Sequence, residues 1–233
     1  MVTTSDESKG TGLLRPFLIG LATSLVFAAV VLVSAGRLTV WQAWVYGGIS
    51  LALNLGQRIL LRTNPELARE RAHPGSRAKT WDKALLGVLL LLTLATLVTA
   101  GLQLRHPGRP SLPFAWFVVG VVLDLAGAVL FSWALRENRF FSAVVRIQRD
   151  RGHAVCTTGP YRVVRHPGNL GMIIGTMGVP LLFQSTWSLV PAGLSVIALI
   201  VRTHLEDVTL TQELDGYRDY RRRTRSRLVP GLW

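Results

Sequence analysis

Residues 84–104, ALLGVLLLLTLATLVTAGLQL, are the clearest structural signal in the chain. They contain no Lys, Arg, Asp or Glu, and about 20 apolar residues are needed for an α-helix to cross the hydrocarbon core of a bilayer. Three further apolar runs, at residues 17–35, 40–61 and 114–135, have similar lengths. Inside lipid every backbone polar group needs a partner within the protein, so these runs predict four transmembrane helices.

Two shorter apolar runs follow towards the C-terminus. Residues 170–183 and 187–201 are separated only by Gln184, Ser185 and Thr186, and each run is short for an independent span. They predict a helical hairpin that either crosses the bilayer or re-enters it from one side. The predicted fold class is therefore all-α: a polytopic integral membrane bundle of four spans plus a C-terminal hairpin. We expect one membrane domain over residues 1–233, with N-terminal spans in 1–132 and a functional half in 133–233.

The net charge of +13 is distributed unevenly along the chain. When Arg58 is counted with the loop that follows it, the successive segments outside the runs contain 2, 1, 7, 2, 7, 0 and 7 Lys and Arg residues. The positive-inside rule places the basic segments, and with them both termini, in the cytoplasm. A soluble nucleic-acid-binding protein would not show this alternation. We therefore expect no nucleic acid partner, and we expect the basic surface to contact anionic membrane lipids.

The chain has a single cysteine, Cys156. One cysteine excludes an intrachain disulfide and a cysteine-cluster metal site. We therefore expect no metal ion at the functional site and an inert small side chain at this position.

The densest group of residues that can carry chemistry is GPYRVVRHPGNLG, residues 159–171. Pro160 and Pro167 each disfavour helix in the residue before them, so Arg165 and His166 are expected at the entrance of the following helix. Free backbone N–H groups and the positive end of the helix dipole add to them there. This arrangement favours binding of a carboxylate or another anion. The simpler alternative is that the arginines contact lipid phosphates and His166 caps a turn.

A second group of polar residues follows the last apolar run. Arg202, Glu206, Thr209 and Glu213 recur at spacings of four, three and four, which places them on one face of a helix. Asp207 adjoins Glu206. Carboxylates at this membrane boundary can accept hydrogen bonds from ribose hydroxyls or pair with Arg202. The alternative is an ordinary exposed i,i+4 salt bridge.

Two features inside the apolar runs also stand out. Asp124 lies near the middle of the run 114–135, where an ionisable side chain is costly and is a candidate for function. It can instead be a neutral or locally paired group in helix packing. Gly171, Gly175 and Gly178 resemble the small-residue positions at which membrane helices approach closely, and packing is the favoured interpretation.

With these residues in view, the C-terminal half resembles the isoprenylcysteine carboxyl methyltransferase family and its bacterial relatives. The resemblance begins near Trp133 and reaches Trp233. The stretches that carry it are ENRFF (137–141), VRIQ (145–148), RGH (151–153), the 159–171 segment, RTHLED (202–207), ELDGY (213–217) and RLVPG (227–231). WDK at 81–83 is similar to a marker of the bacterial branch.

The resemblance implies a methyltransferase of the bacterial plasma membrane that uses S-adenosylmethionine at a cytoplasm-facing site within residues 133–233. It implies that the methyl acceptor is a lipophilic small molecule or a lipid, including an isoprenoid-type carboxylate, that enters from the bilayer. The residues it implies for binding the methyl donor are Tyr161, Arg165, His166, Pro167, Asn169, Leu170, Gly171, Glu206 and Asp207. Those it implies for catalysis are Arg165, Arg202 and Glu206.

The chemistry of the acceptor remains open at this point. A carboxylate acceptor is already ionised at neutral pH, so it needs only orientation, for which Arg202 or Arg165 can form a bidentate pair. An amine or phenol acceptor would need deprotonation, and His166, Glu206 or a tyrosine are then candidate bases.

The resemblance has two departures and two competitors. The family commonly has Tyr at the position of Asn169 and often a second Glu at the position of Asp207. Membrane sterol and isoprenoid reductases, which use NADPH, are similar in their C-terminal regions and are the first alternative. A non-catalytic membrane scaffold is the second. The spacing of the Arg-His-Pro and Glu-Asp pairs resembles the methyltransferases more closely.

Overall fold

The computed structural model describes residues 7–73, 78–106 and 112–233, and these residues form helices with no β-strand among them. The helices are α1 Glu7–Ala35, α2 Trp41–Arg62, α3 Pro65–Ala72, α4 Thr80–Arg105, α5 Phe114–Glu137, α6 Pro167–Leu182, α7 Leu189–Glu213 and α8 Tyr217–Arg223. Two 3₁₀ turns, η1 Arg149–Arg151 and η2 Gly159–Arg162, interrupt the long segment between α5 and α6. The prediction of an all-α fold is confirmed. The first six residues, which the topology prediction assigns to the cytoplasm, lie outside the described residues.

In the part of the chain that the structure describes, four helices are long and apolar enough to cross a membrane: the part of α1 from Leu18 to Ala35, α4, α5 and α7. Three of them match predicted spans, and together they identify an integral membrane protein by length and composition. The predicted span at 40–61 forms α2, which is 22 residues long but less apolar, because its second half contains Asn54, Gln57 and Arg58.

The run 187–201, which is short for an independent span, lies in a longer helix than its apolar length indicates. This run is only the apolar part of α7, which is 25 residues long. The helix does not end where its apolar run ends, because the polar residues up to Glu213 continue the same backbone hydrogen-bond pattern. The hairpin therefore consists of the short helix α6 and a helix that is long enough to cross the membrane.

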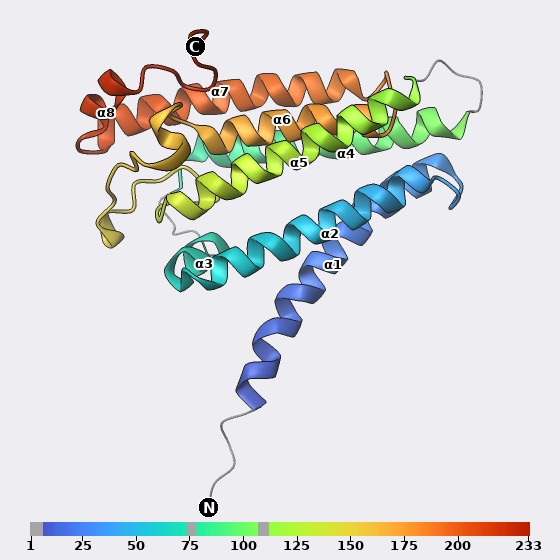
Figure 1. The fold of residues 1–233 in the computed structure, drawn as a ribbon, viewed down its shortest axis with the longest axis horizontal. Coiled ribbons are helices and arrows are strands. Elements are labelled where there is room, and N and C mark those ends of the chain that lie inside the picture. Colours follow the sequence, from blue (N-terminus) through green and yellow to red (C-terminus); the bar gives the residue numbers. More distant parts are fainter. Residues whose placement is uncertain (1–6, 74–77, 107–111) are drawn as a thin grey trace, which may run out of the picture.

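The helices form a bundle in which α4, α5, α6 and α7 run side by side (Figure 1). Helix α2 crosses this group at an angle, and α1 diverges from it towards the N-terminus (Figure 1). Helix α1 contacts α2 and α4, whereas α7 contacts α4 and α6. The most extensive helix contact joins α5 and α6.

Glycines allow α5 and α6 to approach so closely. A Cβ atom added to Gly127 would lie 2.5 Å from the carbonyl oxygen of Gly171 and 2.5 Å from the backbone nitrogen of Gly175. A Cβ atom added to Gly178 would lie 2.7 Å from the carbonyl oxygen of Gly120. The two backbones are thus in direct contact, and the prediction that the α6 glycines serve helix packing is confirmed.

One end of the bundle gathers most of the non-helical chain. Helices α3 and α8 and the segment 138–166 lie at this end, together with the last turn of α5, the first turn of α6 and the last turn of α7 (Figure 1). The basic loops that follow the second, fourth and last apolar runs meet here. The predicted 159–171 segment and the polar end of α7 are thereby brought together.

Candidate functional site

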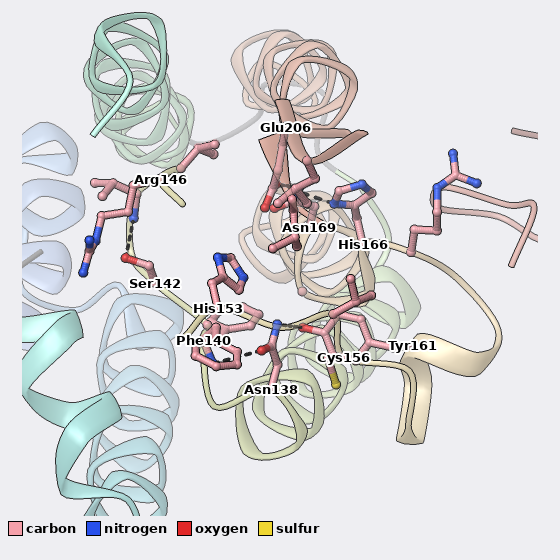
Figure 2. Close-up of a pocket in the computed structure, with 18 of the residues that line it drawn as sticks. Asn138, Phe140, Ser142, Arg146, His153, Cys156, Tyr161, His166, Asn169 and Glu206 are labelled. Atoms are coloured by element: carbon pink, nitrogen blue, oxygen red, sulfur yellow. Dashed lines mark hydrogen bonds and ion pairs between the residues drawn. The ribbon is translucent and has the colours of Figure 1, made fainter. Parts of the chain in front are cut away.

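A cavity of about 250 Å³ lies at this end, bounded by the segment 138–166 and the facing sides of α6 and α7 (Figure 2). Six of the predicted site residues line it: Tyr161, Arg165, His166, Asn169, Arg202 and Glu206. The other four, Pro167, Leu170, Gly171 and Asp207, do not line it. Pro167 begins α6, and Gly171 packs against the backbone of α5. These two positions shape the helix behind the cavity, and their predicted role in binding the methyl donor stays a prediction.

Backbone pairing with the C-terminal tail fixes the start of α6. The N–H of Arg165 donates to the carbonyl of Ser226 at 3.0 Å, and the N–H of His166 donates to the carbonyl of Arg227 at 3.0 Å. Proline at the first helical position has no N–H that would need a partner, so the helix can begin directly after this pairing. The His166 side chain makes no capping hydrogen bond, so the alternative that it only caps a turn is wrong.

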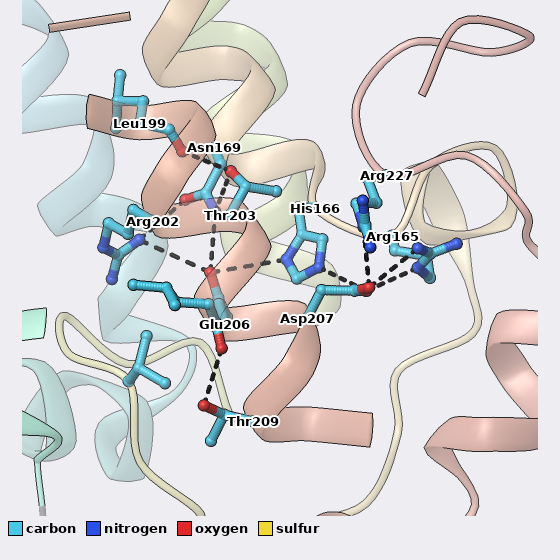
Figure 3. Close-up of polar contacts among 12 residues, drawn as sticks. Arg165, His166, Asn169, Leu199, Arg202, Thr203, Glu206, Asp207, Thr209 and Arg227 are labelled. Atoms are coloured by element: carbon cyan, nitrogen blue, oxygen red, sulfur yellow. Dashed lines mark hydrogen bonds and ion pairs between the residues drawn. The ribbon is translucent and has the colours of Figure 1, made fainter. Parts of the chain in front are cut away.

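Asp207 is the centre of a buried polar cluster (Figure 3). Arg165 donates to both of its carboxylate oxygens, from Nε at 2.8 Å and from Nη2 at 3.1 Å. Arg227 Nε donates at 3.0 Å, the Tyr217 hydroxyl donates at 2.9 Å, and His166 Nε2 lies 3.2 Å from Oδ1. The Asp207 side chain is only 1% exposed. Its acceptor capacity is used by the protein itself, so it holds the start of α6 and the C-terminal tail against α7.

Arg165 is equally occupied. Besides its two bonds to Asp207, its Nη1 donates to the carbonyls of Thr224 and Arg225. All three guanidinium nitrogens are therefore engaged, and the fork that would hold two acceptor oxygens is already closed on Asp207. These contacts are those of a residue that positions the C-terminal tail and Asp207, and the catalytic role of Arg165 stays a prediction.

His166 is 5% exposed and lies between two carboxylates. Its Nε2 faces Asp207, and its Nδ1 lies 3.6 Å from Glu206 Oε2. Burial disfavours the charged imidazolium, but the two carboxylates outweigh burial and raise the pKa of His166 above its ordinary value. The ring is thus favoured in its protonated form, in which both nitrogens donate.

Glu206 differs from its neighbour Asp207 in facing the cavity. Its Oε2 accepts a hydrogen bond from Asn169 Nδ2 at 2.8 Å and lies 3.8 Å from Arg202 Nη1. Within the described part of the chain its Oε1 has no hydrogen-bond partner, and the side chain is 25% exposed. This carboxylate is held in place by one oxygen and presents the other to the cavity.

Asn169 and Arg202 form the support of Glu206. Asn169 accepts from Arg202 Nη1 at 2.9 Å through Oδ1, and its Nδ2 donates to Thr203 Oγ1 at 3.1 Å as well as to Glu206. The amide orientation of Asn169 is defined, because its Oδ1 faces the donor Arg202 and its Nδ2 faces acceptor oxygens of Thr203 and Glu206. The position at which the family commonly has tyrosine thus holds a polar link between α6 and α7.

The alternative of an exposed i,i+4 salt bridge between Arg202 and Glu206 is wrong. The Arg202 side chain is 8% exposed, and its nearest carboxylate is Asp82, whose Oδ1 accepts from Nε at 2.8 Å. Asp82 is fully buried, and its Oδ2 accepts from the backbone N–H of Val145 at 2.7 Å. It joins α4, α7 and the cavity wall. In the sequence Asp82 stands out only as part of the marker at 81–83, although a carboxylate next to an apolar run is costly enough to indicate a buried partner.

The segment after α5 forms the cavity wall. Gln148, which is fully buried, donates from its side chain to the carbonyl of Phe140 at 2.7 Å. His153 accepts from the backbone N–H of Gln148 at 3.2 Å. Burial, together with the positive charges of Arg146 and Arg151, lowers the pKa of His153 to about 4. The imidazole is therefore neutral at pH 7. In the sequence this segment carries only the resemblance, with no pattern that indicates its role as a cavity wall.

Asp124 lies apart from these residues. It is half-buried in α5 and lines a second cavity of about 380 Å³ among α2, α4, α5 and α6. This cavity shares Phe131 and Met172 with the first one. Its carboxylate Oδ1 lies 3.6 Å from the position that a Cβ atom of Gly175 would occupy. Within the described residues, no group of three or more His, Cys, Asp and Glu side chains is placed to hold a metal ion.

Comparison with known proteins concerns the same part of the chain. Residues 115–214, which include α5, α6 and α7, match the phospholipid methyltransferase family. A probable protein-S-isoprenylcysteine O-methyltransferase of Oryza sativa subsp. indica is 36% identical over 84 residues, which are 35% of this chain and 44% of the relative. Protein-S-isoprenylcysteine O-methyltransferase B of Arabidopsis thaliana is 29% identical over 72 residues, or 30% and 36% of the two chains. The similarity thus spans less than half the length of these relatives.

Proposed function

Because residues 115–214 match the phospholipid methyltransferase family, we propose that this chain is a membrane methyltransferase with S-adenosylmethionine as its methyl donor. The proposed acceptor is a lipophilic small molecule or a lipid. The S-isoprenylcysteine in the names of the relatives is one acceptor of this kind, and we propose a carboxylate as its methylated group. The site is proposed to face the cytoplasm, because the basic loops gather at the end of the bundle that contains it (Figure 1).

The different use of two adjacent carboxylates carries this proposal. Asp207 is enclosed by donors of the protein itself, whereas Glu206 presents Oε1 to the cavity. A carboxylate in this position accepts hydrogen bonds from ribose hydroxyls or from an ammonium group, and S-adenosylmethionine contains both. Its negative charge also favours a cationic ligand in this partly buried cavity.

The surrounding residues act on Glu206 and on the shape of the cavity. Asn169 and Arg202 hold Glu206 Oε2, and Asp82 holds Arg202, so the free oxygen has a fixed direction. Tyr161 contributes a buried wall. We therefore assign Glu206 to the donor and treat Arg202 as a positioning residue, in place of the acceptor-orienting role that the sequence predicted for it.

The reaction needs little from the protein beyond positioning. S-adenosylmethionine, when bound, would supply a methyl group attached to a sulfonium sulfur. The leaving group would be the neutral thioether S-adenosylhomocysteine. A carboxylate acceptor is ionised at neutral pH and requires no general base. Holding the two reactants in line can supply much of the rate enhancement, on the order of 7 to 11 kcal/mol for well-oriented groups.

The proposal is tested by ligand titration of detergent-purified protein. The wild type is expected to bind S-adenosylmethionine and S-adenosylhomocysteine but not NADPH, and binding of NADPH alone would assign the reductase function. Glu206→Gln keeps the shape and removes the charge, so it is expected to weaken both methionine-derived ligands roughly 10- to 100-fold.

Glu213→Gln is the matched control on the same helix. Its side chain is 36% exposed and pairs with Lys79 away from the cavity, so it is expected to change affinity by no more than about twofold. Equal affinities in the Glu206 and Glu213 variants would remove Glu206 from the donor site.

A further inference from the structure

Arg71 differs from the other arginines that line the cavity. Within the described residues it has no hydrogen-bond or ion-pair partner, although it lines the cavity wall. The other three are each neutralised by a buried carboxylate. These pairs are Arg146 with Glu70, Arg165 with Asp207 and Arg202 with Asp82.

Two aromatic rings hold the Arg71 guanidinium in place. Its central carbon lies 5.8 Å from the centroid of the Phe131 ring and 5.5 Å from that of the Phe141 ring, both within the range of cation–π contacts. Burial lowers the pKa of Arg71, and no carboxylate opposes this effect. The side chain is therefore a partly desolvated, oriented cation whose N–H donors remain available.

Helix α3 presents Arg71 from a fixed position. The side chain of Asn64 accepts a hydrogen bond from the Leu67 N–H at 3.1 Å and caps the helix. Glu70 receives Arg146 through both oxygens, at 2.8 and 2.6 Å, and also accepts from Ser142 at 2.9 Å. Successive residues on a helix point about 100° apart, so the Glu70 and Arg71 side chains point in different directions. Glu70 pairs with Arg146 in the cavity wall and therefore does not neutralise Arg71.

We infer that Arg71 binds an anionic group of the methyl acceptor, a carboxylate or a phosphate, through its unpaired guanidinium. This inference rests on the proposed function and names the acceptor side of the same site. Both anions present pairs of oxygens that match the two parallel N–H donors of arginine. They would also supply the missing counter-charge in a partly buried environment.

Arg71, the proposed acceptor-binding residue, lies outside the part of the chain that matches the family. Helix α3 lies outside residues 115–214, whereas Glu206 lies within them. Phe131, which contacts Arg71, also lines the second cavity of about 380 Å³ between the helices. An acceptor whose anion meets Arg71 therefore has space for an apolar chain beyond this ring.

The test measures affinity for three amphiphiles that share a farnesyl chain, without the methyl donor. N-acetyl-S-farnesylcysteine is the carboxylate probe, its primary amide is the neutral probe, and farnesyl phosphate is the phosphate probe. The wild type is expected to bind at least one anionic probe roughly 10- to 100-fold more tightly than the amide, because charge-assisted hydrogen bonds have this strength. The stronger of the two anions identifies the source of the charge.

Variants assign that preference to Arg71. Arg71→Gln is expected to abolish the preference, and Arg71→Lys is expected to keep part of it because the charge remains without the planar fork. Arg69→Gln removes the same charge from the same helix at an exposed position outside this cavity, so it is expected to keep the full preference. S-adenosylmethionine affinity should be unchanged in all three variants.

Several results would overturn the inference. A wild type that binds the amide as tightly as the anions, or an Arg71→Gln variant that retains the anion preference, would exclude Arg71 as the anion site. An Arg71→Gln variant that loses S-adenosylmethionine affinity instead would place Arg71 on the donor side. An Arg71-dependent anion preference in a protein that does not bind S-adenosylmethionine would refute the proposed function while the anion site stands.

Discussion

Replacement of Asp207 by asparagine tests whether this carboxylate is a structural centre or a ligand contact. The substitution keeps the size of the side chain and one oxygen acceptor but removes the negative charge. Arg165 and Arg227, whose Nε atoms lie 2.8 and 3.0 Å from the carboxylate, would then share a buried site without their counter-charge. The Tyr217 hydroxyl would compete with them for the remaining oxygen.

The expected destabilisation follows from the burial of the pair. The Arg165 and Asp207 side chains are 3% and 1% exposed, and removing one partner of a buried ion pair costs about 3 to 5 kcal/mol because the other charge is left uncompensated. For a chain of this size 1 kcal/mol corresponds to roughly 2 to 4 °C in Tm, so Asp207→Asn is expected to lower Tm by about 6 to 20 °C.

Thermal unfolding followed by intrinsic fluorescence in detergent measures this effect. Asp219→Asn is the matched control, since its carboxylate is 70% exposed and lies 3.8 Å from Arg222; such a pair contributes about 0 to 1 kcal/mol. A second variant, Arg227→Gln in the Asp207→Asn background, removes one of the two unpaired cations. It is expected to recover part of the lost Tm, which a simple loss of packing would not predict.

One outcome would refute this reasoning. If Asp207→Asn unfolds at the wild-type Tm and weakens S-adenosylmethionine binding as much as Glu206→Gln does, Asp207 is a ligand contact and its bonds to Arg165 and Arg227 are incidental. The predicted separation between the two carboxylates would then be lost.

Two further predictions concern helix packing and pH. Gly127→Ala places a Cβ atom 2.5 Å from backbone atoms of α6, so an overpacking cost of about 1 to 3 kcal/mol should lower Tm by about 2 to 12 °C. The control Gly193→Ala adds a Cβ atom with nothing within 4 Å and should not lower Tm. Equal Tm values in the two variants would contradict the close α5–α6 contact. The pKa of His166 is raised from 6.5, so its charged form stabilises the fold fully below pH 6.5 and this contribution is lost as pH rises through the raised pKa. The Tm difference between wild type and His166→Gln should therefore be larger at pH 6 than at pH 9, and a difference that grows with pH would show that His166 is buried in its neutral form.

The all-α membrane class could be predicted from the sequence, because the length of a hydrophobic run is a local property. Runs such as 84–104 predict membrane helices from their own composition, and the alternation of Lys and Arg predicts which loops share a side. The same locality explains why the run 187–201 is shorter than the helix that contains it. An apolar run predicts only the apolar part of a helix. Helix α7 continues to Glu213, because its backbone hydrogen bonds do not depend on the polarity of its side chains.

The tertiary structure alone decided how the individual site residues are used. Glu206 and Asp207 are adjacent carboxylates, and only the partners brought to them by folding distinguish one from the other. Asp207 is closed by Arg227 of the C-terminal tail, while Glu206 is supported through Arg202 by Asp82, which lies 120 residues away from Arg202 in the sequence. Arg71 is likewise available only because Glu70 finds its partner on a distant segment. Charge pairing in a buried site depends on distance and direction in space, and neither is contained in the spacing of residues along the chain.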